Sequence, residues 1–103
     1  MTIPTQLVLH ALLADPEQEM YGIEIGQAAG LPSGTVHPML ARLEGSGWLE
    51  SRWEDIDPRR EGRPARRYYR LTPTGVQLAH EALARSAHGH RLFPALRPAG
   101  GPA

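Results

Sequence analysis

The segment from Leu31 to Gly47, LPSGTVHPMLARLEGSG, constrains the fold of this chain most strongly. Its apolar residues recur at spacings of three and four, which places them on one face of a helix over 33–46: Val36, Met39, Leu40 and Leu43. Ser33 is expected to cap this helix by accepting hydrogen bonds from backbone N–H groups. The opposite face carries small or polar residues. This pattern is typical either of an ordinary surface helix or of one whose backbone approaches a large polar surface.

Two further helices are expected before this segment, over Pro4–Ala14 and Ile23–Ala29. Asp15-Pro16 ends the first, because the residue before a proline disfavours the helical region. Gly30 ends the second, and Gly30-Leu31-Pro32 makes a short turn into the next helix. Two helices joined by such a glycine-containing turn predict a helix-turn-helix.

The chain beyond Gly47 indicates a β-hairpin followed by a last helix. Side chains alternate from Trp48 to Glu54, and Arg66–Leu71 is the expected return strand. The polar loop between them, residues 55–66, is expected to be held extended by its glycine and prolines. Pro73 opens the last helix. These elements predict a winged helix-turn-helix, mainly α with a small β-hairpin (α+β), in which the loop is the wing.

The 103 residues predict one domain with a modest core, of a size that dimerisation often completes. The first helix is apolar on nearly all sides and the last carries two apolar stripes, so each is expected to meet a second subunit. A central core helix in a monomer is the alternative for the first. Residues expected at the dimer interface are Leu7, Leu9, Leu12, Leu13, Val76, Leu78 and Leu83. The domain is expected over 1–88, with a flexible Pro/Gly-rich tail over 89–103.

Charge is segregated along the chain although the formal net charge is zero. All 11 Lys and Arg residues are arginines. Residues 1–51 hold one arginine against six acidic residues, whereas residues 59–70 hold six arginines against Glu61 alone. Local charge density influences the choice of partner more than the sum does.

The arginines of the loop are the strongest functional signal. A narrow DNA minor groove attracts inserted arginine, and the guanidinium group binds phosphate in bidentate fashion. A solvated charged loop is the alternative. The loop residues expected to contact double-stranded DNA are Arg59, Arg60, Gly62, Arg63, Pro64 and Arg66.

Helix 33–46 supplies the other expected DNA contacts. Ser33 and Thr35 lie at its N-terminus, where hydroxyl groups and the helix dipole favour phosphate. His37 and Arg42 are candidates for contacts to base edges or phosphate. Each has a structural alternative: a cap only for Ser33, solvated surface for Thr35 and His37, and an ion pair with a neighbouring glutamate for Arg42. Pro38 removes one hydrogen bond from the helix.

No reactive constellation is visible, so we expect no enzyme, catalytic residue, metal or cofactor. The absence of cysteine excludes disulfides and thiolate metal sites. The five histidines show no metal-ligand pattern beyond the weak His88-Gly-His90. The first residues lack a basic region and soon reach acids and proline, which predicts neither a signal peptide nor a membrane span. A soluble cytoplasmic protein is expected.

Two other functions stay open from the residues alone. A winged helix can hold another regulator instead of DNA, and the acidic first half favours such an adaptor. A sensor could instead bind an aromatic effector among Trp48, Trp53 and the last helix, at the dimer interface. For these tryptophans, packing in the core or at a dimer contact is the preferred interpretation.

From Tyr21 to about Arg85 the chain resembles the PadR family of bacterial transcriptional regulators. The matching stretches are Tyr21-Gly22, Gly30–Leu43, Gly47–Ser51, Gly62-Arg63-Pro64 and Arg67–Gly75 (RYYRLTPTG). The resemblance implies a homodimer that binds palindromic operator DNA, usually as a repressor. It places the third helix in the major groove and the wing tip near the minor groove.

Carried over by position, the resemblance assigns Ser33, Thr35, His37 and Pro38 to the recognition segment and Gly62, Arg63 and Pro64 to the wing. The family usually has tyrosine where this chain has His37, so its base contacts differ here. The short region after the wing is similar to that of shorter members, whose single last helix makes the dimer. Some members bind planar aromatic compounds between subunits, so a small-molecule effector is a possible partner.

Overall fold

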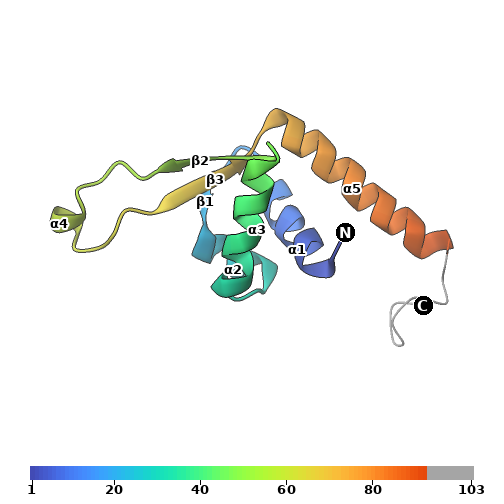
Figure 1. The fold of residues 1–103 in the computed structure, drawn as a ribbon, viewed down its shortest axis with the longest axis horizontal. Helices are drawn as coiled ribbons and strands as arrows, with labels where there is room; N and C mark the ends of the chain where they lie inside the picture. The colour runs from blue at the N-terminus through green and yellow to red at the C-terminus, as the bar shows by residue number, and fades with distance from the viewer. Residues whose placement is uncertain (93–103) are drawn as a thin grey trace.

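The computed structural model describes the backbone of residues 1–92 and the side chains of residues 1–87. The elements in chain order are α1 (Ile3–Leu13), β1 (Met20–Tyr21), α2 (Gly22–Ala29), α3 (Ser33–Gly45), β2 (Leu49–Trp53), α4 (Pro58–Glu61), β3 (Arg67–Leu71) and α5 (Pro73–Leu92). The three strands form one antiparallel sheet in the order β1-β3-β2. The prediction of a mainly helical winged helix-turn-helix is confirmed (Figure 1).

The core lies where α1, α2 and α3 pack together against the sheet. Its buried side chains are Val8, Leu12, Ile25, Ala29, Val36, Met39, Leu40, Leu49 and Leu71. The inward face predicted for α3 is confirmed, because Val36, Met39 and Leu40 are buried and Leu43 packs against them. Ile23, at the start of α2, lies outside this core and is 56% exposed.

The turn between α2 and α3 is tight because two glycines allow it. Gly30 caps α2 with a φ of 72°, a left-handed conformation that glycine adopts without strain. The N–H of Leu31 then donates to the carbonyl of Gly26 at 2.8 Å. A Cβ on Gly26 would lie 2.8 Å from the carbonyl oxygen of Leu31. A larger residue at either position would therefore move α3 relative to α2.

The predicted cap of α3 is wrong. Pro32 occupies the N-cap position without a side-chain hydrogen bond, and Ser33 is the first helical residue with an exposed side chain. Its hydroxyl is consequently turned to the surface. α3 continues through Pro38, which is exposed.

Two short elements were not predicted. β1 is only two residues long and pairs with β3, Met20 opposite Tyr69. The wing is not wholly extended, because Pro58–Glu61 forms the single helical turn α4 at its tip. Asp57 caps this turn by accepting from the N–H of Arg59 at 3.0 Å, and Gly62 closes it with a φ of 68°.

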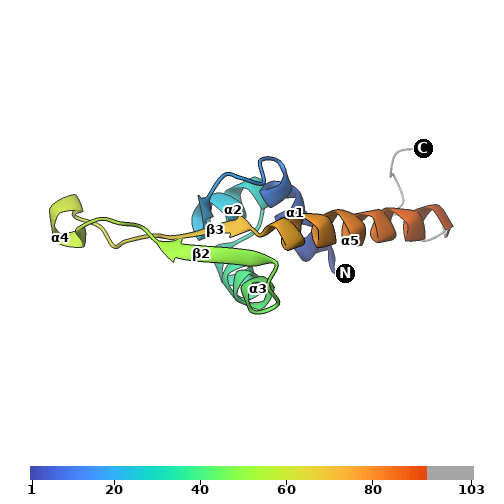
Figure 2. The ribbon, with the colours of Figure 1, turned by 90° about the horizontal axis from the view of Figure 1, so that it is seen from above.

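The hairpin and α5 leave the body on opposite sides (Figures 1 and 2). The resulting radius of gyration, 15.9 Å, exceeds the roughly 13 Å expected of a compact chain of this size. α5 continues to Leu92, past the expected start of the tail at residue 89. Residues 93–103, which make up most of that expected tail, and the side chains of His88 and His90 lie outside the described part.

The side chains expected at a dimer interface divide into two groups. Leu9 and Leu12 are buried within the single chain, which removes them from the expected interface. Leu13, Val76, Leu78 and Leu83 are half-buried, and Leu7 is 39% exposed. Met1 and Ile3, beside Leu7 at the chain's start, are more than half exposed. Around the expected dimer interface, the apolar surface left uncovered therefore lies at the beginning of α1.

Candidate nucleic-acid interface

The outward face of α3 is nearly bare. Five residues predicted to contact DNA are exposed on this helix: Ser33, Thr35, His37, Pro38 and Arg42. Between them a Cβ placed on Gly34 would meet no other atom within 4 Å, and the same holds at Gly45. A helix so thinly covered can bring its backbone close to a broad polar surface such as the major groove, which admits a helix.

One flank of α3 faces the hairpin through His37. This residue lines a cavity of about 170 Å³ together with Arg66 and Arg67 of the hairpin and Gly22 of α2. A Cβ on Gly22 would lie only 2.6 Å from Cε1 of His37. Gly22 therefore provides the space that His37 occupies, which gives a physical reason for the Tyr21-Gly22 motif.

Glu44 joins α3 to both strands of the hairpin. Its carboxylate accepts a hydrogen bond from Oγ of Ser51 on β2 and lies 3.5 Å from Nη2 of Arg67 on β3. The guanidinium of Arg67 is in turn 5.1 Å from the ring centre of Trp53, which is 62% exposed. Arg67 thus lies on the same side of the sheet as α3.

The other arginines of the strands are engaged by glutamates. Arg52 donates to both carboxylate oxygens of Glu19, at 2.6 and 2.9 Å, and this hydrogen bonding lowers the pKa of Glu19. Arg70 donates to Glu50 directly across the sheet, at 2.6 and 2.9 Å. The acidic residues of the first half of the sequence therefore neutralise part of the arginine-rich region.

Arg63, predicted to contact DNA, is held within the wing by Glu54. The two residues form a bidentate pair, with Nη1 2.7 Å from Oε1 and Nη2 3.0 Å from Oε2. The hydrogen bonds from Arg63 hold the pKa of Glu54 at about 2, against a usual value of 4.5. The guanidinium of Arg66 rests 4.4 Å from the ring centre of Tyr21. Neither side chain extends to the tip of the wing.

Two arginines stand at the tip instead. Arg59 and Arg60 lie on α4, both are exposed, and the ion pairs formed among the described residues do not include them. Gly62 follows them as the left-handed residue that turns the chain back. Figure 1 shows α4 at the end of the hairpin farthest from α5.

Arg42 lies on the opposite flank of α3 from His37. It is exposed and lines a cavity of about 390 Å³ beside Met1, Thr2 and Trp48. The expected alternative, an ion pair with Glu44 or Glu24, is not formed among the described residues. The structure therefore does not bring Arg42 together with the wing arginines.

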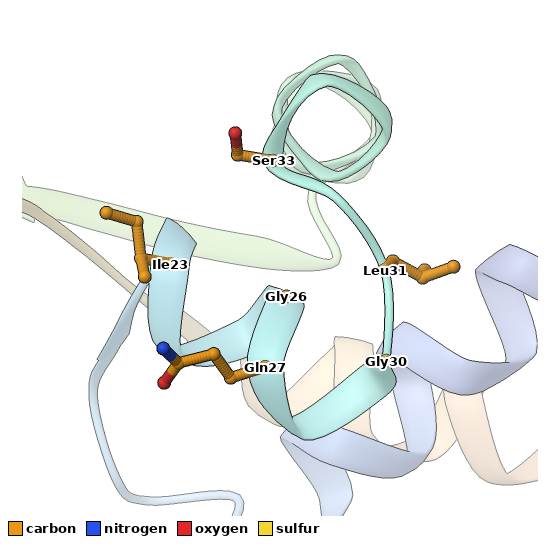
Figure 3. Close-up of a pocket in the computed structure, with 6 residues that line it drawn as sticks. All are labelled: Ile23, Gly26, Gln27, Gly30, Leu31 and Ser33. Carbon is orange, nitrogen blue, oxygen red and sulfur yellow. The ribbon is translucent and has the colours of Figure 1, made fainter.

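A hollow of about 470 Å³ lies between α2 and the N-terminal end of α3 (Figure 3). Ser33 borders it from α3, and Ile23 and Gln27 border it from α2. The sequence did not single out Gln27 or the hairpin residue Arg67. Helical periodicity marks Gln27 as exposed, but only the fold shows that it lines the same hollow as Ser33.

The expected effector site among the tryptophans is not assembled within one chain. Trp48 borders the cavity near Met1, whereas Trp53 is exposed at the far end of β2. Trp53 is therefore not packed in the core of the single chain, and its packing at a dimer contact stays a prediction. Among the described residues, no cluster of three or more histidine or acidic side chains could hold a metal. No described helix has the length and apolar character needed to cross a membrane.

Two solved structures of transcriptional regulators are similar to this chain. The PcaV regulator of Streptomyces coelicolor, solved with its natural ligand, matches with a TM-score of 0.71 at 28% identity, over 97% of this chain and 65% of that one. A PadR family transcriptional regulator from Eggerthella lenta matches with a TM-score of 0.69 at 26% identity, over 88% of this chain and 80% of that one. This chain therefore spans just under two thirds of the length of PcaV.

A third structure shows the fold alone: BpsR of Bordetella bronchiseptica matches with a TM-score of 0.68 at 22% identity, over 95% of this chain and 69% of that one. The search of curated proteins found no match. The sequence profile of the family described as "Transcriptional regulator PadR-like family" matches residues 8–81, well over half of the chain. With the winged helix-turn-helix fold, this match shows that the chain belongs to the PadR-like family of transcriptional regulators.

Proposed function

We propose that this chain acts in the cytoplasm as a homodimeric repressor that binds a palindromic operator. The observation that carries the proposal is the shared surface of α3 and the hairpin, joined through Glu44, Ser51 and Arg67. In this arrangement α3 enters the major groove while the wing follows the backbone toward the adjacent minor groove.

The proposed contacts fall into two classes. Hydrogen bonds from Ser33 and Thr35 and the charges of the wing tip position the protein on phosphate. His37 is placed to reach a base edge, and Pro38 makes an apolar contact beside it. Arg42 is assigned to phosphate on the far flank of α3, since it is exposed there and has no described ion-pair partner. The proposed contacts of the wing are Arg59, Arg60, Gly62, Pro64 and Arg66.

The proposed dimer rests on the apolar surface at the start of α1 and on the projecting α5. Met1 and Ile3 are 52% and 58% exposed, and Leu7 is 39% exposed. α5 is 20 residues long, about 30 Å at 1.5 Å per residue, and extends beyond the body of the chain (Figure 1). A two-fold dimer through these elements would hold its recognition helices about 34 Å apart.

The dimer is tested by light scattering on the purified chain. We expect the mass of two chains, and the mass of one for Ile3→Asp, because a carboxylate would be buried without a partner in the interface. Thr35→Asp is the matched control, since Thr35 is exposed on α3 and lies outside the proposed interface. A monomeric parent protein would contradict this part of the proposal.

DNA binding is tested by titrating a labelled random duplex at several salt concentrations. We expect weak affinity at about 50 mM salt that falls steeply as salt rises, because bound arginines release counterions. Selection from random sequences should then return two-fold symmetric sites with half-sites about one helical turn apart. Absence of binding to any duplex at low salt would overturn the proposal and favour the adaptor.

Control by a small molecule is a second proposal, and it rests on the likeness to PcaV, which was solved with its natural ligand. Since no chain assembles the tryptophan site alone, we place the ligand between subunits. A panel of planar aromatic acids should raise the melting temperature of the dimer and release bound DNA. If no compound does either, this proposal fails without affecting DNA binding.

A further inference from the structure

Glu54 stands at the point where the pairing of the hairpin strands ends. The register of β2 with β3 closes with Trp53 opposite Arg67. One residue farther out, the N–H of Glu54 donates to the carbonyl of Arg66 at 2.7 Å. Residues 55–62, which we call the wing tip, lie beyond this point and contain α4.

Four donors converge on the Glu54 carboxylate. Oε1 accepts from Nη1 of Arg63 at 2.7 Å and from the N–H of Arg66 at 3.2 Å. Oε2 accepts from Nη2 of Arg63 at 3.0 Å and from the hydroxyl of Tyr68 at 3.4 Å. The Glu54 side chain is only 15% exposed, although it belongs to a projecting hairpin. We call this cluster the wing clamp.

The wing tip has little else to hold it. α4 is a single turn with no buried residue, and a helix this short is not stable by itself. Its caps, Asp57 and Gly62, organise the turn locally but do not connect it to the body. The wing clamp is the side-chain contact that ties the outgoing and returning chain together at the base of the tip.

We propose that Glu54 is a positioning residue for DNA binding: with Arg63 it fixes the wing so that Arg59 and Arg60 are presented to the phosphate backbone. The inference rests on the proposed DNA-binding function and deepens it. It also assigns Arg63 to the clamp, and not to a direct contact with DNA. The motif Gly62-Arg63-Pro64 then has a structural role. Gly62 makes the turn, Arg63 forms the clamp with Glu54, and Pro64 restricts the returning backbone.

Electrostatics alone predicts that Glu54 weakens DNA binding, which is the opposite of the proposed effect. A carboxylate on a surface that meets DNA repels phosphate, so its removal should strengthen binding. In the clamp, however, the charge of Glu54 is already matched by that of Arg63 in a bidentate pair. Removing Glu54 would loosen the tip, and ordering it again on binding would cost conformational entropy. The sign of the change in affinity therefore separates the two explanations.

The matched variants are Glu54→Gln and Asp55→Asn, which each remove one negative charge at neighbouring positions. Asp55 is exposed and forms no side-chain hydrogen bond or ion pair in the part of the chain that the structure describes. A random duplex of about 30 base pairs, long enough for two half-sites, serves as the probe. We expect Glu54→Gln to weaken binding about tenfold and Asp55→Asn to leave it unchanged or slightly stronger. Equal affinity of the two variants would overturn the inference.

Arg63→Lys tests the geometry of the clamp, because lysine keeps the charge but cannot form the two parallel hydrogen bonds. We expect it to weaken binding as much as Glu54→Gln does. Wild-type affinity for Arg63→Lys would show that Arg63 acts as a simple charge, and would overturn its assignment to the clamp.

Limited digestion with trypsin reports the wing without DNA. Cleavage after Arg59 and Arg60 should be several-fold faster in Glu54→Gln and Arg63→Lys than in the parent or Asp55→Asn, with an unchanged melting temperature. Unchanged cleavage rates would overturn the clamp itself. Failure of the parent protein to bind any duplex would overturn the proposed function instead, so the two failures are distinguishable.

Discussion

The stem and the tip of the wing both carry arginines but differ in what those arginines contact. In the stem, which comprises β2, β3 and residues 54 and 63–66, four arginines are paired with glutamates: Arg52, Arg63, Arg67 and Arg70. At the tip, Arg59 and Arg60 are exposed and take part in none of these ion pairs. A run of arginines in a sequence therefore mixes cations that build the wing with cations that remain available to a ligand.

The surroundings of each arginine explain the difference. Glu50 lies directly opposite Arg70 in the sheet. Glu19 and Glu44, from segments packed beside the hairpin, reach Arg52 and Arg67. The tip has no strand partner and no core. Its arginines extend into solvent from a single capped turn. We infer that the tip contributes more to DNA affinity than the stem does.

The largest expected effect comes from removing the tip charges. Arg59→Ala with Arg60→Ala should weaken binding to a random duplex at low salt by tenfold or more. The slope of log affinity against log salt should become shallower by about 4 for a dimer that engages both half-sites, since each phosphate contact contributes about one unit. Fluorescence anisotropy at a series of salt concentrations measures both.

The matched control removes two stem charges, with Arg52→Ala and Arg70→Ala. Because both guanidinium groups already neutralise glutamates, their loss should change affinity by less than about threefold and leave the salt slope nearly unchanged. A loss equal to that of the tip variant would break the distinction between stem and tip.

A second prediction contrasts the wing with α3. His37→Ala should weaken binding to a selected operator by about five- to a hundredfold, the range of about 1–3 kcal/mol typical of one base contact. On a random duplex the same variant should bind like the parent, whereas the tip variant loses affinity on both. Equal losses on both duplexes would reassign His37 to phosphate. The melting temperature checks that its packing against Gly22 is not the cause.

The elements of this fold were predictable where the information is local. The spacing of Val36, Met39 and Leu40 determines α3, and Gly30 marks the end of α2, because both signals act within one or two helical turns. The wing tip carries a similar local signal for its helical turn α4, although α4 was not predicted. Asp57-Pro58 is a favourable helix start and Gly62 a favourable end, so α4 could have been read from the sequence.

The rest depended on contacts between distant residues. β1 is two residues long and forms because Met20 pairs with Tyr69, which is distant in the sequence. No alternating pattern of apolar and polar residues predicts it. The availability of each arginine likewise depends on the register of β2 with β3. Arg63 lies nine residues from Glu54, and nothing in their spacing shows that the hairpin closes them into a bidentate pair. The wing residues that we propose to contact DNA could therefore be located as a segment but not separated one by one.

A smaller effect is expected on stability. Arg52→Gln should lower the melting temperature by at most a few degrees, because ion pairs between exposed side chains are screened by water and salt. Glu54→Gln should lower it no more than that, since the clamp lies outside the core. A large drop for either variant in a thermal melt would show that the stem supports the whole fold and not only the wing.

The smallest expected effect is the absence of a pH response from the wing clamp between pH 5 and 8. The pKa of Glu54 is depressed to about 2 from a usual value of 4.5, chiefly by its hydrogen bonds from Arg63. A group whose pKa is lower in the folded state stabilises that state fully above the unfolded value, and the contribution disappears as the pH falls toward the folded value. The clamp should therefore begin to weaken only below about pH 4.5. Carbon-13 NMR of the Glu54 carboxyl should show a midpoint near 2, and Arg63→Lys should move it upward. A midpoint of 4.5 in the parent protein would mean that the clamp is open in solution, and stem and tip would then be equally mobile.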